Sequence, residues 1–375
     1  MSSNRGKGEF DMERESINML LPRGISRRKM LRLLGLAGAA AAMPAAMRPA
    51  LAQSKSLTLF TWSTWGEPDF VSTAKDKIGL DLKPTFYSSS DEMMAKLRGG
   101  GTKLYDMIVP VQNYIEPAAK AGLIEPFDPA AFTYSKDIFE QFSTSPQWRV
   151  DGKLYGIPFV WGANAMAFNR KETGDLDSLG ALFDPKFKGR IAMRDEPEDT
   201  LAVGALQLGI KRPYAMEEKE LQEVKKLLIS QKPLVRAYWK NVADVQNMLA
   251  SGEVVVAWSF LAVIAPLLKA GVDVGWVWPK EGAIGWSEAI SAVKGTSKFK
   301  LVQEYANFTL SPEYGEMMAR TTRYAPSSKA AISHLEPQLV KDLGIDIDKI
   351  SRLIFKELPK DKSRWNEIWN EVKAA

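Results

Sequence analysis

Tryptophan and acidic side chains recur near the expected ends of strands in this chain of 375 residues. The chain contains eleven tryptophans, and several of them lie close to an aspartate or a glutamate. An aromatic face attracts a cation, and a carboxylate pairs with an ammonium group through a charge-assisted hydrogen bond. A cleft that combined both groups would bind an organic amine. The residues of this set are Trp62, Trp65, Glu196, Asp199, Trp258, Trp286 and Glu288.

Some of these residues also have a purely structural interpretation. Trp258 ends an apolar run and is equally compatible with a position in the core. Glu196 and Asp199 lie at the start of a predicted helix. Acids are favourable there in any protein, because the helix N-terminus carries a partial positive charge. Residue type and spacing leave both interpretations open.

Short β-rich runs alternate with helical runs in the first half of the chain, an order typical of βαβ units. We predict strands over residues 57–62, 80–87 and 105–109, with a helix in each interval. Ligands of parallel sheets bind at the carboxyl ends of the strands. The sequence therefore predicts that residues 62–66 and 110–114 border the site.

Two long apolar segments indicate a second lobe. Residues 157–169 suit a strand that leaves one domain and enters another, and residues 274–278 followed by 284–293 suit the return crossing. Two lobes joined by two crossing segments form a hinged clamp. The predicted first lobe is 53–163 with 286–326 returning to it, and the predicted second lobe is 164–285 with 327–375 packing as C-terminal helices.

Residues 1–52 have the features of a signal peptide. Arg27 and Arg28 precede a weakly hydrophobic run over 33–47, and Ala50-Leu51-Ala52 supplies small residues for cleavage. The paired arginines indicate a twin-arginine signal, which exports a folded chain. The alternative, a membrane anchor, needs about 20 apolar residues. Because no cysteine is available for lipid attachment, we expect a periplasmic protein without an anchor.

Composition excludes several function classes. The chain has 50 basic and 45 acidic residues, and nine of the basic and four of the acidic ones lie within residues 1–52. The remainder is formally neutral, so there is no electrostatic case for binding nucleic acid or an anionic membrane. The chain has no cysteine and one histidine, and it lacks the nucleotide, esterase and zinc-protease motifs. We expect no catalytic residues, no metal and no cofactor.

The chain resembles the periplasmic polyamine-binding proteins, the spermidine and putrescine receptors of ABC importers, over roughly residues 57–372. The resemblance implies a type II periplasmic binding fold: two α/β lobes, each a mostly parallel sheet flanked by helices, that close on a ligand around a hinge. It also implies delivery to permease subunits in the inner membrane and a monomeric receptor. The segments that carry it are Leu59-Phe-Thr-Trp-Ser-Thr-Trp65, Tyr105-Asp-Met-Ile-Val-Pro110, Ile157-Pro-Phe-Val-Trp-Gly-Ala163, Val277-Trp-Pro-Lys-Glu-Gly282 and Tyr324-Ala-Pro326.

The resemblance also assigns ligand-binding roles. An acidic pair would receive an amine, a late carboxylate would replace the family's aspartate, and aromatic residues would flank the ligand, with Trp65 in the place of a tyrosine. These positions are Trp62, Trp65, Glu196, Asp199, Trp258, Trp286, Glu288 and Tyr324.

The chain departs from the family pattern in three places. Val111 and Asn113 replace a serine and an aromatic residue, the family's late glutamine has no clear equivalent near Phe355, and Arg323 stands beside the expected cation site. An elongated di- or triamine is favoured, but a betaine or another amino compound with a carboxylate could use Arg323, unless Arg323 is simply a solvated surface residue.

Other functions on the same residues stay open. A sugar receptor of this fold would also use tryptophan stacking. An iron receptor usually needs paired tyrosines, which this pattern lacks. An exported hydrolase could use Glu196, Asp199 and Glu288 as an acid and base pair.

Overall fold

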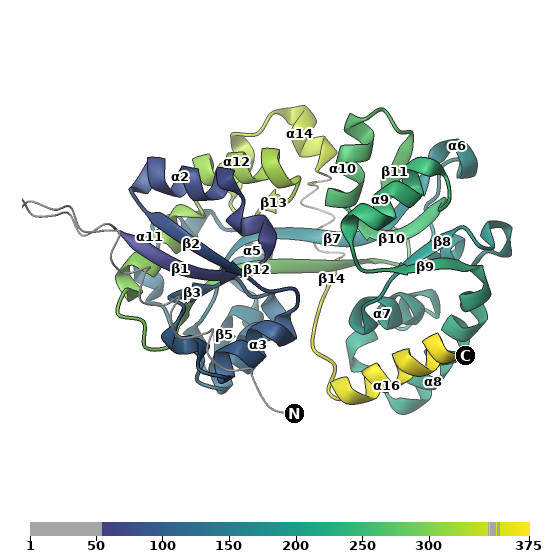
Figure 1. The fold of residues 1–375 in the computed structure, drawn as a ribbon, viewed down its shortest axis with the longest axis horizontal. Helices are drawn as coiled ribbons and strands as arrows, with labels where there is room; N and C mark the ends of the chain where they lie inside the picture. The colour runs from purple at the N-terminus through teal and green to yellow at the C-terminus, as the bar shows by residue number, and fades with distance from the viewer. Residues whose placement is uncertain (1–54, 344, 346–349, 351–352) are drawn as a thin grey trace, which may run out of the picture. The chain divides into compact units, whose positions relative to one another are not determined.

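The computed structural model describes residues 55–343, 345, 350 and 353–375 (Figure 1). The predicted signal peptide, residues 1–52, lies outside the described residues. Within the described ranges, no helix is both long enough and apolar enough to span a bilayer.

The N-terminal part forms the βαβ arrangement that the sequence predicts. Strands β1 (Ser56–Thr61), β2 (Asp81–Phe86) and β3 (Met107–Ile108) are parallel neighbours. Helix α2 (Pro68–Ile78) begins with a proline in its first turn and ends at Gly79, whose φ of 66° suits glycine. Helix α3 (Ser90–Arg98) is capped by the Ser89 side chain, which accepts a hydrogen bond from the Glu92 N–H.

Two long antiparallel strands connect this part to the rest of the sheet. Strand β7 (Ile157–Asn169) pairs with β12 (Ala283–Val293), whose other edge pairs with β3 and β4 (Ile124–Glu125). A β-bulge interrupts the β7–β12 pairing between Glu288 and Ala289. Figure 1 shows both strands running through the middle of the structure, as expected for the two crossing segments. The sheet order is β2-β1-β3-β12-β7-β10-β8-β9.

The far half of the sheet has helices on both faces. Strands β8 (Ile191–Arg194) and β9 (Val235–Trp239) are parallel, and β10 (Val256–Phe260) joins β8 to β7. Alternate strand residues point to opposite faces. Ile191 and Val256 therefore pack in one core cluster with α7 (Pro197–Gln207) and α8 (Glu218–Gln231). Ala192 and Ala257 pack in another with α9 (Val242–Ser251) and α10 (Leu261–Lys269).

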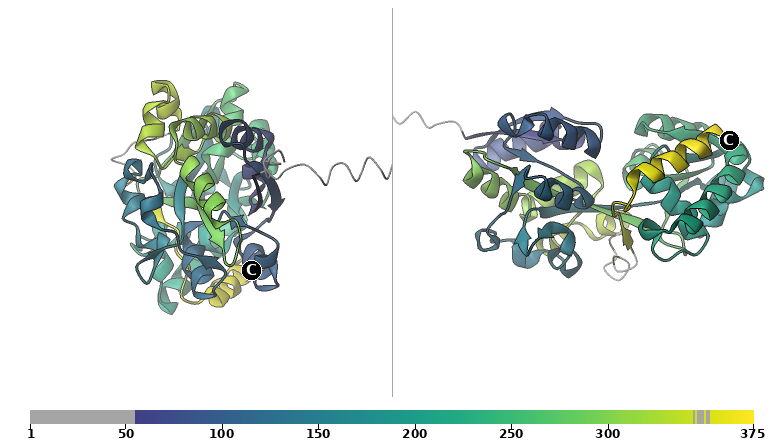
Figure 2. Two further views of the ribbon diagram at one scale, coloured as in Figure 1. Left: turned by 90° about the vertical axis from the view of Figure 1, so that its left-hand side faces the viewer. Right: turned by 90° about the horizontal axis from the view of Figure 1, so that it is seen from below.

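The last part of the chain divides between two surroundings. Helix α12 (Pro312–Thr322) contacts α13 (Lys329–Ser333), and its Ala319 shares a core cluster with Leu339 of α14 (Pro337–Asp342). Helix α16 (Lys362–Ala374) instead lies beside α7 and α8 (Figure 2), where its Trp365 stacks on Tyr214 with ring centroids 6.0 Å apart. The predicted lobe boundaries, including the assignment of 327–375, stay a prediction.

The remaining elements are short, apart from α11, and several of them border the site. They include η3 (Ser63–Gly66), η5 (Gln112–Tyr114), α4 (Ile115–Lys120), α5 (Glu140–Ser143), β5 (Arg149–Val150), β6 (Lys153–Leu154), α6 (Arg170–Thr173), β11 (Val274–Val277), α11 (Phe299–Phe308), β13 (Ala325–Pro326) and β14 (Leu353–Phe355).

Candidate functional site

Strand β12 presents Trp286 and Glu288 on one face, because residues two apart in a strand point the same way. Ser287, between them, is buried on the opposite face, where its hydroxyl donates to the Val160 carbonyl at 2.7 Å. The Trp286 ring lies against Gly162 of β7. A Cβ at Gly162 would lie 2.4 Å from that ring, so only glycine leaves the space that the indole occupies.

Glu288 is a partly buried carboxyl group with one hydrogen-bond donor. Trp65 Nε1 donates to its Oε2 at 2.5 Å, and no cation of the described chain forms an ion pair with it. Burial raises the pKa of Glu288 to about 8, although the hydrogen bond from Trp65 acts in the opposite direction. The carboxyl group is therefore mostly protonated at neutral pH. A cation beside it would favour the ionised form and pair with it.

Aromatic rings surround this carboxyl group. The fully buried Trp65 packs edge-on against Phe159 at 4.9 Å. Tyr324 lies edge-on to Trp286 at 4.8 Å and faces Trp65 at 6.4 Å. Trp62, at the end of β1, contacts Tyr87 at 4.6 Å. The structure thus brings together four of the predicted residues, Trp65, Trp286, Glu288 and Tyr324, whereas Trp62 contacts Tyr87.

The predicted acidic pair has a different environment, because two cations of the protein occupy it. The Arg194 guanidinium pairs with Asp199 at 2.7 Å and with Glu196 at 2.9 Å. The Lys356 ammonium pairs with Asp199 at 2.6 Å and with Glu196 at 3.0 Å. Asn164 Nδ2 donates a further hydrogen bond to Asp199 at 2.7 Å. We call Arg194, Glu196, Asp199 and Lys356 the ionic cluster.

Electrostatics in the ionic cluster favours the charged forms. Burial alone would raise the pKa of Glu196, but Arg194 and Lys356 lower it to about 2. Burial alone would lower the pKa of Lys356, but Asp199 and Glu196 raise it above its ordinary value. Both residues therefore remain ionised at neutral pH.

Lys356 is a site residue that the sequence did not reveal. It directly follows β14, at the place where the sequence offered no glutamine, and its backbone carbonyl accepts a hydrogen bond from Gln112 Nε2 at 3.1 Å. A single lysine among apolar and charged residues carries no recognisable pattern. Only the long-range return of β14 beside β12 shows its partners.

Trp258 does not join the other aromatic residues. It is 0% exposed and belongs to the core cluster beneath α7 and α8, and its carbonyl accepts a hydrogen bond from Trp239 Nε1. Phe260, two residues later, instead lines a pocket beside Trp286 and Tyr324. The Arg194 guanidinium lies 5.6 Å from the centre of the Phe260 ring. A ligand-binding role for Trp258 stays a prediction.

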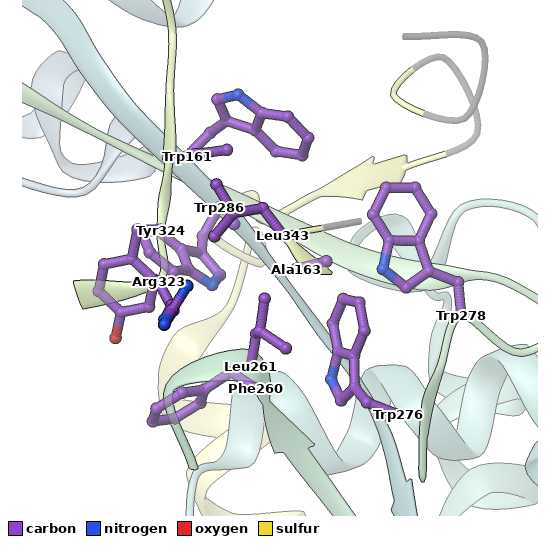
Figure 3. Close-up of a pocket in the computed structure, with 12 residues that line it drawn as sticks. Trp161, Ala163, Phe260, Leu261, Trp276, Trp278, Trp286, Arg323, Tyr324 and Leu343 are labelled. Carbon is purple, nitrogen blue, oxygen red and sulfur yellow. The ribbon is translucent and has the colours of Figure 1, made fainter. Parts of the chain in front are cut away.

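Figure 3 shows a pocket next to Trp286 and Tyr324 with largely aromatic walls. Its cavity volume is about 10 Å³, close to the space that one water molecule needs, so a solute requires its walls to separate. Arg323 lies at its edge in the left-handed conformation, with a φ of 61°, and no acidic residue lines it. The aromatic lining residues are Trp161, Phe260, Trp276, Trp278, Trp286 and Tyr324.

One of the two replaced wall residues, Val111, lies beside Glu288. Val111 forms a single antiparallel bridge with Glu288, and Asn113 has a buried Oδ1 atom without a hydrogen-bond partner in the described chain. Within the described residues, no group of three or more histidine, cysteine, aspartate or glutamate side chains could hold a metal ion.

Comparisons with known proteins agree with this architecture. The family model described as "Bacterial extracellular solute-binding protein" matches residues 71–343. The spermidine/putrescine-binding periplasmic protein of Escherichia coli K12 is 26% identical over 297 residues, which cover 77% of this chain and 82% of that protein. The putrescine/cadaverine-binding protein of Pseudomonas aeruginosa is 23% identical over 346 residues, which cover 85% of this chain and 94% of that protein.

Solved structures share the fold. A putative spermidine/putrescine ABC transporter protein from Listeria monocytogenes superposes with a TM-score of 0.74 at 24% identity, over 85% of this chain and 99% of that one. The spermidine/putrescine substrate-binding protein PotD of Streptococcus pneumoniae gives 0.74 at 18% identity, over 86% and 98%. The predicted two-lobe type II fold is thereby confirmed. Because the family model matches more than half of the chain, the protein belongs to the bacterial extracellular solute-binding proteins.

Proposed function

We propose that the protein is the periplasmic solute-binding component of an ABC importer, and that it captures an organic amine of the polyamine class and delivers it to the membrane permease. Relatives whose names specify spermidine, putrescine or cadaverine support this ligand class. The observation that carries the proposal is the Glu288 carboxyl group, which has no ion-pair partner among the described residues and lies among Trp65, Trp286 and Tyr324.

The binding step is the docking of an ammonium group at Glu288. The ammonium donates hydrogen bonds to the carboxylate, while neighbouring aromatic faces stabilise the positive charge by about 0.5 to 2 kcal/mol each. Contacts that form only when both lobes touch the solute shift the population toward the closed state. The closed receptor then docks on the permease as a monomer. In this proposal the protein performs no catalysis and uses no cofactor or nucleic acid.

Docking at Glu288 couples amine capture to proton release. Because its pKa is about 8, Glu288 is mostly protonated at pH 7 and must ionise to pair with an ammonium group. Calorimetric titrations at pH 7 in two buffers of different ionisation enthalpy should therefore reveal the release of nearly one proton per bound amine. At pH 9 the release should disappear. An unchanged proton count at both pH values would contradict this role of Glu288.

The direct test is the variant Glu288→Gln. An amide cannot neutralise an ammonium group, and loss of one partner of a buried charge pair costs about 2 to 5 kcal/mol. We expect at least about 100-fold weaker binding of putrescine or spermidine in calorimetric titrations. Glu223→Gln is the matched control, because Glu223 is exposed on α8 and forms no ion pair or side-chain hydrogen bond within the part of the chain that the structure describes. Equal affinities in the two variants would disprove the proposed site.

A second candidate ligand class has its own supporting observation. The ionic cluster already pairs Glu196 and Asp199 with cations of the protein, which favours an amino compound that also carries a carboxylate. For a sugar ligand or for hydrolysis, no comparable observation exists, and the low pKa of Glu196 makes it a poor general acid or base at neutral pH.

We also propose that the chain is exported by the twin-arginine route and carries no lipid anchor. Replacing Arg27 and Arg28 by lysine should retain the protein in the cytoplasm. Immunoblots of periplasmic and cytoplasmic fractions measure this directly. Normal export of the double variant would exclude the route while leaving the proposed receptor function untouched.

A further inference from the structure

We propose that Gln112 is the positioning residue of the amine site: its side-chain amide holds the peptide group of Ser287 and thereby sets the direction of Glu288 on β12. This inference rests on the proposed amine receptor, because Glu288 is the group at which the ammonium docks. In this proposal, Gln112 itself makes no contact with the solute. Three observations carry it: an interruption of the β7–β12 pairing, a loop that holds the other edge of β12, and a ring of hydrogen bonds through the amide.

The pairing with β7 does not by itself fix the direction of the Glu288 side chain. The register of the two strands shifts between Glu288 and Ala289, where it skips Phe159 of β7. A bulge of this kind interrupts the hydrogen-bond ladder and lets the strand bend locally. Contacts on the other edge of β12 are therefore needed to hold the docking group in one direction.

The loop after β3 holds this other edge of β12 with its backbone. The Pro110 carbonyl accepts a hydrogen bond from the Ala289 N–H at 3.1 Å, and Val111 forms an isolated antiparallel bridge with Glu288. Because both contacts use backbone groups, almost any residue type in the loop would supply them. They hold residues 288 and 289, and they leave the N-terminal side of Glu288 to another group.

Gln112 holds the residue on the N-terminal side of Glu288. Its Oε1 atom accepts a hydrogen bond from the Ser287 N–H at 2.8 Å. Both residues are 1% exposed, so water is poorly placed to replace this acceptor. A buried N–H without an acceptor is unfavourable, and the Ser287 peptide would turn toward a new acceptor if the amide were removed. Such a turn would carry the Glu288 side chain with it, away from the Trp65 indole that donates to it.

The other end of the Gln112 amide closes a ring of hydrogen bonds on β12. Its Nε2 atom donates to the Lys356 carbonyl at 3.1 Å, and the Lys356 N–H donates in turn to the Gly285 carbonyl at 2.9 Å. The ring therefore runs from Ser287 through Gln112 and Lys356 back to Gly285, two residues earlier on the strand. Trp286 lies between the two anchored residues and projects to the opposite face. The amide thus fixes a short stretch of β12 immediately before the docking group.

A double-mutant cycle on the full chain tests the role of Gln112. The variant Gln112→Met keeps an unbranched side chain of similar length and removes both hydrogen bonds. Because a buried N–H then lacks its acceptor, we expect putrescine to bind at least about tenfold more weakly in calorimetric titrations. In the Glu288→Gln background, the same substitution should change the affinity by less than about threefold, because Gln112 acts through Glu288. Equal losses in the two backgrounds would reduce Gln112 to a general structural role and overturn the inference.

Gln147→Met is the matched control. Gln147 lies in the turn η8 (Pro146–Trp148), and its Nε2 atom donates to the same Lys356 carbonyl at 3.3 Å. Within the described part of the chain, its side chain forms no hydrogen bond with β12. We expect Gln147→Met to bind putrescine within about threefold of the wild type, because the Ser287 contact stays intact. A loss as large as that of Gln112→Met would place the effect at Lys356 instead of Ser287 and contradict the proposal.

Gln112→Glu decides the inference if Gln112→Met does not fold. Burial favours the neutral form of a carboxyl group, and a protonated carboxyl group offers one acceptor and one donor, as the amide does. We therefore expect this variant to bind putrescine within about threefold of the wild type at pH 6, where protonation is most complete. A loss of tenfold or more would show that an acceptor for the Ser287 N–H is not sufficient to position Glu288.

Hydrogen exchange of the protein without solute reports on the strand itself. We expect the Ser287 amide to exchange at least about tenfold faster in Gln112→Met than in the wild type, because its acceptor is lost. The Ala289 amide, which donates to the Pro110 carbonyl, should exchange at an unchanged rate. Equal acceleration at both amides would mean that the whole strand has loosened, against a specific positioning role. If the wild type binds neither putrescine nor spermidine, the receptor proposal fails together with the inference, whereas the other contrary outcomes remove the inference alone.

Discussion

Glu288 and the pair Glu196 and Asp199 are acids near one cleft, but their partners differ. Among the described residues, Glu288 receives one hydrogen bond, from the Trp65 indole, and burial raises its pKa to about 8. Glu196 has two cations of the protein beside it, and its pKa falls to about 2. An acidic residue in a cleft is therefore available to an amine only when the protein has not already neutralised it.

The largest difference should appear in stability when Asp199 is replaced by asparagine. Asp199 is 0% exposed, and its loss leaves Lys356 and Arg194 undercompensated. Breaking a buried ion pair costs about 3 to 5 kcal/mol. We expect a loss of about 3 kcal/mol in the free energy of unfolding, measured by urea denaturation. Glu288→Gln, measured alongside at neutral pH, should not lower it, because the neutral amide replaces a carboxyl group whose raised pKa opposes folding there; equal losses would remove the distinction between the two sites.

A substitution in the wall behind Glu288 should have the next largest effect. In Gly162→Ala the new methyl group would overlap the Trp286 ring, which must tilt away. Overpacking of this kind costs about 1 to 3 kcal/mol. We expect amine binding to weaken as well, because the ring borders the pocket. Gly99→Ala is a suitable control, since its nearest neighbours are backbone atoms of its own helix end at 3.3 Å and beyond.

The dependence of stability on pH should have opposite signs for the two acids. The raised pKa of Glu288 means that the folded protein holds this proton more tightly than the unfolded chain. Stability should therefore fall as pH rises from about 4.5 to 8, by at most about 1.4 kcal/mol per pH unit. Glu196, with its lowered pKa, stabilises the fold above pH 4.5, and this contribution is lost as pH falls toward 2.

Denaturation curves of the wild type and of Glu288→Gln at pH 5, 6, 7 and 8 isolate the first effect. The difference between the two proteins should grow in favour of the variant as pH rises. A constant difference over this range would show that Glu288 titrates at its ordinary value of 4.5.

The smallest effect should come from Lys362→Gln. This residue pairs with Asp91, which is 66% exposed, and with Glu198, which is 11% exposed, but the Lys362 side chain itself is 30% exposed. Water around the lysine screens these pairs, which contribute up to about 1 kcal/mol. We expect a loss of less than about 1 kcal/mol in urea denaturation. A loss as large as that of Asp199→Asn would mean that exposure does not determine the strength of these ion pairs.

Local signals in the sequence were sufficient to predict much of the fold. Pro68 and Gly79 define the ends of α2, and the apolar run 157–169 is a single strand, because these features depend on neighbours in the chain. Residue types were also sufficient to nominate Trp286 and Glu288. Their placement on one strand face follows from a spacing of two residues.

Long-range pairing was beyond the reach of sequence analysis. Lys356 meets Asp199 across more than 150 residues, because β14 returns beside β12. Trp258 is buried in the core against α7 and α8, whereas Phe260 lines the pocket. This difference depends on packing between distant segments, which the local sequence does not specify. Trp276 and Trp278 looked like parts of a crossing segment, and their unpaired N–H groups became evident only in three dimensions.

The bulge between Glu288 and Ala289 gives the crossing strands a mechanical property. Strands β7 and β12 are hydrogen-bonded along most of their length. We therefore expect them to bend as a pair, unlike two flexible linkers that move independently. A ladder bends most readily where its pairing is interrupted. The residue that the register skips, Phe159, lies in β7 opposite Glu288 and Ala289, so we expect any bend of the two strands at this point to move the Glu288 carboxyl group with it.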